Sequence, residues 1–298
     1  MAERLSFHEQ IQKNKIKSFL LIVVIFAFFI AVGFLISMAV DPGYFFVIMI
    51  FATIFSLIYT VFGYYKSAEI AIASVKARKA TKAGDGKFWN AAENMSIASG
   101  LPMPRLYVMD SKEINAFASG RDPSHAVICA TTGAIEKLDK QELEGVIGHE
   151  MSHIANYDIR FMTLTAVLVG MISIIAQIFL RNLWFSNGQD RKGNAWLFFA
   201  AMIAAILAPI VAQLVSLAIS RRREYGADAT AVKFTRYPPG LSRALRKIKS
   251  EHVDSAEMKK YPKAVAPLFI SDPFKKKVQG LFSTHPPIDE RIRKLERM

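Results

Sequence analysis

Four long stretches of the sequence contain no acidic or basic residue, and they constrain the fold more than any other feature. A helix needs about 20 apolar residues to cross a hydrocarbon core of about 30 Å, and each stretch is long enough. A helix is the expected form because lipid cannot satisfy backbone hydrogen-bonding groups. The alternative is that these stretches are buried helices of a large soluble core. This alternative has more weight for the third and fourth stretches, which are shorter or more polar than the first two. We expect transmembrane helices at 18–40, 43–65, 161–180 and 196–220.

The first of these stretches also has to be weighed against a cleavable signal peptide. Arg4, Lys13, Lys15 and Lys17 precede it and give it a basic lead. The apolar region of a signal peptide spans about 7–15 residues, however, whereas this one is longer and a second apolar stretch follows at once. We therefore expect a retained membrane anchor.

The basic residues predict how the chain lies across a membrane. The sequence has 38 Lys and Arg residues against 25 Asp and Glu residues, a formal net charge of +13. The amino-terminal tail, 66–160 and the tail from 221 are rich in basic residues, so the positive-inside rule places them in the cytoplasm. The charge then fits attraction to anionic inner-leaflet lipids, and no nucleic-acid-binding motif accompanies it. Cys129 is the only cysteine, which excludes an internal disulfide and agrees with a reducing compartment.

The polar segments between the apolar stretches show both helix and strand signals. Asp139 is an acidic N-cap followed by Glu142 at the third helical position, which predicts the start of a helix. Apolar residues then recur at helical spacing as far as Ile154. Glycine and proline residues punctuate the region before this helix. We expect helices at 69–81, 88–99 and 140–156, and strands at 105–109 and 125–131.

The helix at 140–156 carries the sequence His-Glu-Met-Ser-His at 149–153. A spacing of four residues puts His149 and His153 on one face, one turn apart, which suits two ligands of one zinc ion. Glu150 lies about 100° around the helix, close enough to act on a zinc-bound water without being a ligand. Zinc lowers the pKa of its water toward 7, and the carboxylate accepts the water proton and passes it to the leaving amine. Two ordinary surface histidines are the alternative, although composition gives a chance match a frequency of only about 1%.

A catalytic zinc site usually has three protein ligands, so a third ligand has to come from elsewhere in the chain. Cys129 has no supporting pattern. Glu224 and Asp228 are one helical turn apart, so Glu224 is spaced to bind the metal while Asp228 orients a ligating histidine. An acidic pair that balances the three arginines at 221–223 is an equally good interpretation of this segment.

Three further short motifs accompany the two candidate metal-binding segments. They are Asn-Ala-Phe-Ala-Ser-Gly at 115–120, Thr-Gly at 132–133, and His-Pro at 285–286 followed by Arg291. Together with His-Glu-x-x-His, Glu-x-x-x-Asp and four apolar stretches, they resemble the HtpX family of bacterial membrane metalloproteases. That family is related to the CAAX prenyl endopeptidases and to the mitochondrial inner-membrane protease Oma. The resemblance covers nearly the whole chain.

The resemblance implies a zinc peptidase of the gluzincin type, with one zinc ion per chain and Glu224 as the third ligand. It also implies that Asn115 holds the substrate backbone, that His285 donates to the oxyanion, and that Arg291 supports that site. A turn asparagine, a helix-start histidine and an exposed arginine are the alternatives for these three. The implied location is a bacterial inner membrane, and the implied role is quality control of misfolded membrane proteins.

The expected fold is a four-span helical membrane region that carries a mixed α+β cytoplasmic zinc domain. The domain is discontinuous, because 66–160 and 221–298 form it while 1–65 and 161–220 form two membrane hairpins. The zinc helix ends shortly before the third span and Glu224 follows the fourth, so we expect the active site close to the inner membrane surface. Cytoplasmic loops and tails, or proteins extracted from the bilayer, are then the natural polypeptide substrates. We expect an edge of the small sheet to bind substrate by strand addition.

Two other classes of membrane protein use similar residues. An intramembrane metalloprotease keeps its motif within an apolar span, whereas Glu142, Glu144, Asp158 and Arg160 flank the motif here. A metal transporter keeps ionisable groups inside its spans, and these four stretches have none. A non-catalytic scaffold is a further alternative, but it leaves Glu150 without a purpose. We therefore predict a membrane-bound zinc endopeptidase.

Overall fold

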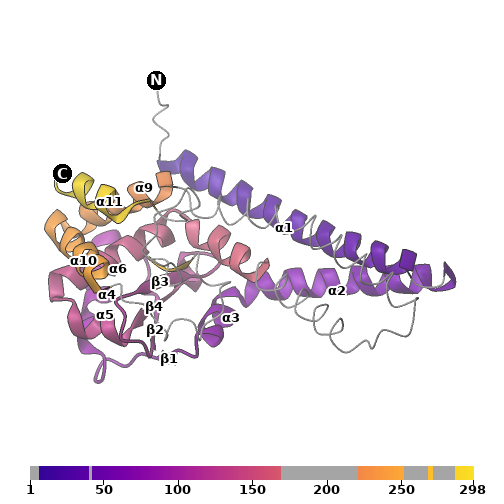
Figure 1. Cartoon of the computed structure of the whole chain (residues 1–298), viewed down its shortest axis with the longest axis horizontal. Coiled ribbons are helices and arrows are strands. Elements are labelled where there is room, and N and C mark those ends of the chain that lie inside the picture. Colours follow the sequence, from indigo (N-terminus) through magenta and orange to yellow (C-terminus); the bar gives the residue numbers. More distant parts are fainter. Residues whose placement is uncertain (1–6, 40–41, 169–220, 252–267, 271–285) are drawn as a thin grey trace.

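The computed structural model describes residues 7–39, 42–168, 221–251, 268–270 and 286–298. In it, α1 (Phe7–Ala39) and α2 (Phe45–Tyr65) form a long hairpin that projects from a body of shorter helices and a sheet (Figure 1). The two helices approach closely at Gly33, where a Cβ atom would lie 2.3 Å from the Cβ atom of Ala52. The absence of a side chain at this position therefore allows the helices to pack.

Two helices in the described part of the chain are long and apolar enough to cross a membrane, Ile11–Phe34 and Phe45–Tyr65. Large apolar side chains such as Phe46 and Phe51 point outward and are 77% and 68% exposed. An apolar surface of this extent is unfavourable in water, so lipid is the expected surrounding. These helices correspond to the first two predicted spans. In the third predicted span, residues 161–168 are helical and buried. The rest of this span and the whole of the fourth predicted span lie outside the described residues.

The body is built on a four-stranded sheet with the order β1-β2-β4-β3. Its strands are β1 (Arg78–Lys79), β2 (Arg105–Met109), β3 (Ala116–Ser119) and β4 (Val127–Thr131). β2 and β4 are parallel, and β1 and β3 pair antiparallel with them at the two sides of the sheet. Beyond β3, Phe117 forms an antiparallel bridge with Phe269, and the Ile270 N–H donates to the carbonyl of Ala116. The chain itself therefore occupies part of the edge that we expect to bind substrate.

Short helices pack around this sheet. They are α3 (Ser67–Ser74), α4 (Gly86–Ser99), α5 (Thr132–Lys137), α6 (Lys140–Ala155), α9 (Arg221–Thr235), α10 (Pro238–Glu251) and α11 (Ile288–Leu295). The helices predicted at 88–99 and 140–156 and the strand predicted at 105–109 are confirmed, with small differences at the helix ends.

The helix predicted at 69–81 is wrong in its second half. α3 ends at Ser74, and Lys76 then adopts a left-handed conformation with a φ angle of 52°. The chain turns there and enters β1, which pairs with β2. Pairing in the sheet overrides the helical propensity of this alanine-rich segment.

The strand predicted at 125–131 is two residues too long at its start, because β4 begins at Val127. Asp122 caps a short 3-10 turn that includes His125, and its side chain accepts a hydrogen bond from the His125 N–H. The sequence reasoning also did not anticipate β1 and β3. The sheet therefore has more strands than the two that the sequence predicts.

α6 lies at the centre of the body, with α4, α9 and α10 packed against it and β3 beside it. The predicted capping box is present, since Asp139 accepts from the Glu142 N–H and Glu142 accepts from the Asp139 N–H. Gly145 permits the crossing with α10, because a Cβ atom there would lie 2.6 Å from the backbone nitrogen of Leu241. Nearly the whole helix is buried. Its histidines are therefore carried by a rigid element.

Candidate metal centre

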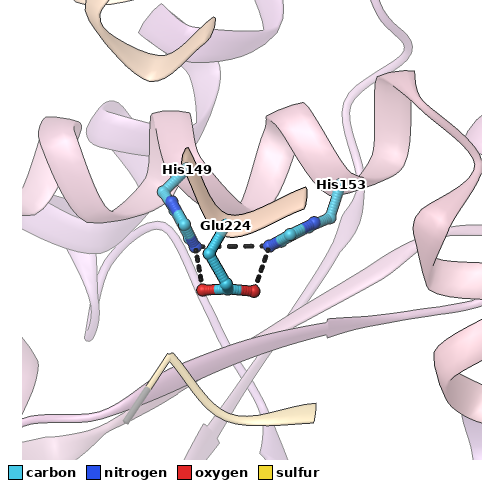
Figure 2. A group of neighbouring side chains, drawn as sticks. All are labelled: His149, His153 and Glu224. Carbon is cyan, nitrogen blue, oxygen red and sulfur yellow. Dashed lines mark hydrogen bonds and ion pairs between the residues drawn. The ribbon is translucent and has the colours of Figure 1, made fainter. Parts of the chain in front are cut away.

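Three side chains from two helices converge at the centre of the body (Figure 2). His149 and His153 extend from α6, and Glu224 extends from α9. The two Nε2 atoms are 3.2 Å apart. His149 Nε2 lies 3.6 Å from Glu224 Oε2, and His153 Nε2 lies 3.6 Å from the other oxygen, Oε1. All three side chains are buried. The fold thus brings together two histidines and a glutamate that lie on either side of residues 169–220 in the sequence.

The spacing of these atoms suits a tetrahedral metal ion. Zinc binds imidazole nitrogen and carboxylate oxygen at about 2.0–2.2 Å, so neighbouring ligand atoms in a tetrahedron lie about 3.3–3.6 Å apart. The separation of 3.2 Å between the two Nε2 atoms and the 3.6 Å from each Nε2 to its nearer Glu224 oxygen are close to these values. Two imidazoles and one carboxylate are also a common donor set for catalytic zinc, with a fourth position left open. The residues present therefore fit the ion that the sequence predicts.

The other nitrogen of each imidazole faces a second carboxylate. Asp228 Oδ1 lies 2.9 Å from His149 Nδ1, and Asp158 Oδ2 lies 3.2 Å from His153 Nδ1. Because a carboxylate accepts hydrogen bonds, a neutral imidazole at either position keeps its proton on Nδ1 and presents the lone pair of Nε2 to the centre. Two lone pairs and a carboxylate at these distances repel one another unless a cation lies between them.

The surroundings of His149 favour a positive charge. Burial opposes charging of the imidazole, but hydrogen bonds with Asp228 and Glu224 outweigh burial and raise the pKa of His149 to about 9. A proton or a divalent metal ion satisfies the same electrostatic demand. The charge distribution therefore agrees with the donor geometry.

Arg291, on α11, is buried against the carboxylate that faces His149. Its Nε and Nη2 atoms donate to the two oxygens of Asp228 at 2.9 and 2.7 Å, which is a bidentate pairing. Its Nη1 atom lies 3.6 Å from Glu224 Oε2. Burial alone would raise the pKa of Asp228, but the charge of Arg291 and the bond with His149 prevail and lower that pKa. Asp228 is therefore held in its ionised form.

Glu150 follows His149 along α6 and is only 2% exposed. Burial raises the pKa of its carboxyl group, although the two histidines and a hydrogen bond from the Ala118 backbone favour the ionised form. The bond from Ala118 places Glu150 beside β3. A carboxyl group with a raised pKa next to side chains that could hold a metal ion is suited to accept a proton near neutral pH.

Comparison with known proteins identifies the family to which this site belongs. The model of the family described as Peptidase family M48 matches residues 85–298, which is more than half of the chain. The chain belongs to peptidase family M48. Membership makes the protein a metalloprotease, and the predicted enzyme class is confirmed.

Relatives of this M48 protein extend the match to nearly the full chain. A protease HtpX homolog from Dictyoglomus thermophilum is 41% identical over 293 residues, which cover 98% of this chain and 95% of the relative. A protease HtpX homolog from Tropheryma whipplei is 39% identical over 289 residues, with 97% of each chain covered. The predicted resemblance to the HtpX family is therefore confirmed.

A solved structure shares the fold of this M48 protein. The crystal structure of S. mikatae Ste24p matches 96% of the chain with a TM-score of 0.50 at 20% sequence identity. The chain spans 66% of the length of that structure. At this level of identity, the likeness concerns the fold alone.

The other residues that the sequence predicts for the site differ in where they lie in this M48 fold. Asn115 is buried at the start of β3, and its Oδ1 atom accepts a hydrogen bond from the next backbone N–H at 3.0 Å. Arg291 is 1% exposed, so it is not the exposed arginine of the alternative interpretation. His285 lies outside the described residues. Cys129 is buried in β4 and does not belong to the group of three side chains in the described part of the chain that could hold a metal ion. Roles at the oxyanion or the substrate stay predictions.

Sequence reasoning missed three residues of this M48 site. Asp158 contacts His153, Asn14 of α1 donates to Asp158 at 2.8 Å, and Arg223 Nε lies 3.7 Å from Asp158. Asp158 follows His153 beyond the end of the helix, so helical spacing does not point to it. Asn14 and Arg223 arrive through tertiary packing. No local signal in the sequence marks them.

Proposed function

We propose that this M48 protein is a membrane-bound zinc-dependent endopeptidase. His149, His153 and Glu224 hold one zinc ion per chain, and Glu150 is the general base. The observation that carries the proposal is the convergence of His149, His153 and Glu224, whose ligand atoms lie within 4.8 Å of one another, beside a buried carboxyl group with a raised pKa. A third ligand from a separate helix, α9, corresponds to the gluzincin type.

Each side chain has a distinct part in peptide hydrolysis. Zinc, when bound, supplies Lewis acidity that polarises a water molecule and the scissile carbonyl. Glu150 accepts the proton of the attacking water and delivers it to the departing amine. Asp228 and Asp158 keep both imidazoles in the tautomer that presents Nε2 to the centre. Arg291 fixes Asp228 through its bidentate bond.

We also propose that substrate binds along β3. The Ala118 N–H on this strand donates to Glu150, so a peptide that adds along the remaining part of the β3 edge is brought to the base. Asn115 holds the peptide backbone at the start of the strand, and His285 donates to the oxyanion. The resemblance to the HtpX family supports these two roles.

The membrane setting of the proposal rests on the two apolar helices and on the distribution of basic residues. The body carries Lys and Arg in excess, which places it in the cytoplasm by the positive-inside rule. With the third and fourth predicted spans, the chain crosses a bacterial inner membrane four times and both termini are inside. Misfolded membrane proteins and their cytoplasmic loops are the substrates within reach. Labelling of a Lys82→Cys variant by an impermeant maleimide in intact cells would contradict this orientation.

Replacement of Glu150 by glutamine tests the chemistry. In full-length protein purified in detergent, we expect stoichiometric zinc in both wild type and Glu150→Gln, and casein cleavage at least about 10²-fold slower in the variant. Glu144→Gln is the matched control, because Glu144 lies on the same helix but contacts Asn94. A chelator should abolish wild-type cleavage, and added zinc should restore it. Cleavage by protein that holds no stoichiometric metal would refute the proposal.

A further inference from the structure

Asn14 of the membrane helix α1 forms hydrogen bonds with the turn that follows α6. Asn156 and Tyr157 form this turn, and the next helix begins at Asp158. Tyr157 has a φ angle of 59°, a left-handed conformation that is uncommon for a bulky side chain. The Asn14 Nδ2 group donates to the carbonyl of Asn156 at 2.9 Å and to Oδ1 of Asp158 at 2.8 Å. One amide group of α1 therefore bridges the two ends of the turn.

Further contacts fix the junction between α1 and this turn. Asn14 is 4% exposed, and a buried amide without acceptors would be costly. The Nζ atom of Lys15 lies 4.4 Å from the centre of the Tyr157 ring. Beyond the turn, apolar side chains of α1 and of the following helix form one buried cluster that includes Leu21, Ile25, Phe29, Phe161, Leu164 and Leu168. The amide of Asn14 is thus held in place by packing on both sides.

Asp158 connects this junction to the metal centre. One of its oxygens accepts the hydrogen bond from Asn14, and the other faces His153 Nδ1 at 3.2 Å. Asp158 is fully buried. Because α1 holds one oxygen, the carboxylate cannot rotate without losing that bond, and its second oxygen stays directed at the imidazole. Two contacts in a row, from Asn14 to Asp158 and from Asp158 to His153, therefore lead from a membrane helix to a side chain that we propose as a zinc ligand.

We propose that Asn14 is a positioning residue for the metal site and acts on His153 through Asp158. The inference rests on the proposed function, which makes His153 a zinc ligand. It gives α1 a part in catalysis in addition to anchoring, because the helix that enters the lipid also fixes the orientation of an imidazole. An amide suits the task, since its two hydrogens reach a carbonyl and a carboxylate at once.

Two substitutions of Asn14 test the inference in the full-length protein. Asn14→Ala removes both donated bonds. Asn14→Leu removes them as well but keeps the branched shape of the side chain, and leucine is compatible with an apolar membrane helix. We expect each variant to bind zinc about tenfold more weakly in competition with a chelator, because groups behind a metal ligand contribute about 10–100-fold to affinity. The visible spectrum of the cobalt-substituted protein should also change, since it reports the arrangement of the ligands.

Ser18→Ala is the matched control. Ser18 lies one turn further along α1, is equally buried, and donates its hydroxyl hydrogen bond to the backbone carbonyl of Asn14. Loss of this bond weakens α1 locally without removing the amide that contacts Asp158. Zinc affinity and the cobalt spectrum should match those of the wild type.

A double-mutant cycle separates positioning from a general loss of stability. In an Asp158→Ala background, Asn14→Ala should change zinc affinity by less than about twofold, because the residue through which it acts is gone. A further tenfold loss in that background would overturn the inference, as would equal effects of Ser18→Ala and Asn14→Ala. Wild-type protein without stoichiometric metal would instead overturn the proposed function, so the two failures can be told apart.

Discussion

Replacement of Arg291 by methionine tests whether the buried ion pair of α11 stabilises the metal centre. Arg291 is 1% exposed and donates two hydrogen bonds to Asp228, at 2.9 and 2.7 Å. Asp228 is itself buried, and its Oδ1 atom lies 2.9 Å from His149 Nδ1. Methionine fills much of the same space but carries no charge. The variant therefore leaves the Asp228 carboxylate buried without its cationic partner.

The expected loss of stability is large. Removal of one partner of a buried ion pair costs about 3–5 kcal/mol, because the remaining charge is poorly solvated. A typical domain has a free energy of unfolding of about 5–15 kcal/mol, so Arg291→Met removes a substantial part of it. Zinc affinity should fall by about 10–100-fold as well, since Asp228 is no longer fixed against His149.

Two measurements separate the possible roles of Arg291. Unfolding followed by circular dichroism in detergent gives the stability, and chelator competition gives the zinc affinity. Arg293→Met is the matched control, because Arg293 is exposed on the same helix and its loss should change stability by no more than about 0.5 kcal/mol. A stability equal to that of the control would refute the argument. A lower kcat with unchanged stability and zinc affinity would assign Arg291 to the oxyanion.

Two more predictions concern packing and pH. Gly145→Ala should destabilise the protein by about 1–3 kcal/mol, because the new Cβ would lie 2.6 Å from the Leu241 nitrogen. Gly86→Ala is the control, because a Cβ atom there would have open space around it, and its thermal melting should match that of the wild type. Hydrogen bonds from Arg78 outweigh burial and lower the pKa of Asp85, so its stabilising effect is present above the ordinary pKa of 3.8 and is lost as the pH falls through the lowered value. Asp85→Asn should therefore cost about 1 kcal/mol at pH 6 and less at pH 3 in unfolding experiments, whereas an equal cost at both would contradict this.

The zinc helix could be predicted because its signals are local. Asp139 and Glu142 satisfy each other's backbone groups within one turn, so sequence spacing alone defines the start of α6. The position of His149 relative to His153 follows from helical geometry in the same way. Glu224 is different, because a spacing of four residues fits both a metal ligand and a surface acidic pair. Family resemblance, not spacing, favoured the first interpretation.

The remaining features depend on contacts between distant segments. β1 has two residues and β3 is buried on both faces, so neither shows the alternation that marks a strand. Asp158 gains its place at the site from a turn with a left-handed Tyr157, and the sequence carries no clear signal for such a turn. Asn14 reaches Asp158 only because α1 packs against the helix that follows α6. Tertiary packing decides each of these cases.

The order of the ligands along the chain has a consequence for biosynthesis. His149 and His153 are translated before 169–220, and Glu224 is translated after it. A ribosome that has completed α6 has therefore produced two imidazoles without the carboxylate that completes the donor set. If Glu224 is the third ligand, as we propose, the nascent polypeptide stays inert as a protease until α9 has been made and has docked beside α6. Under the proposed function, neighbouring unfinished chains would thereby be protected from it during membrane insertion.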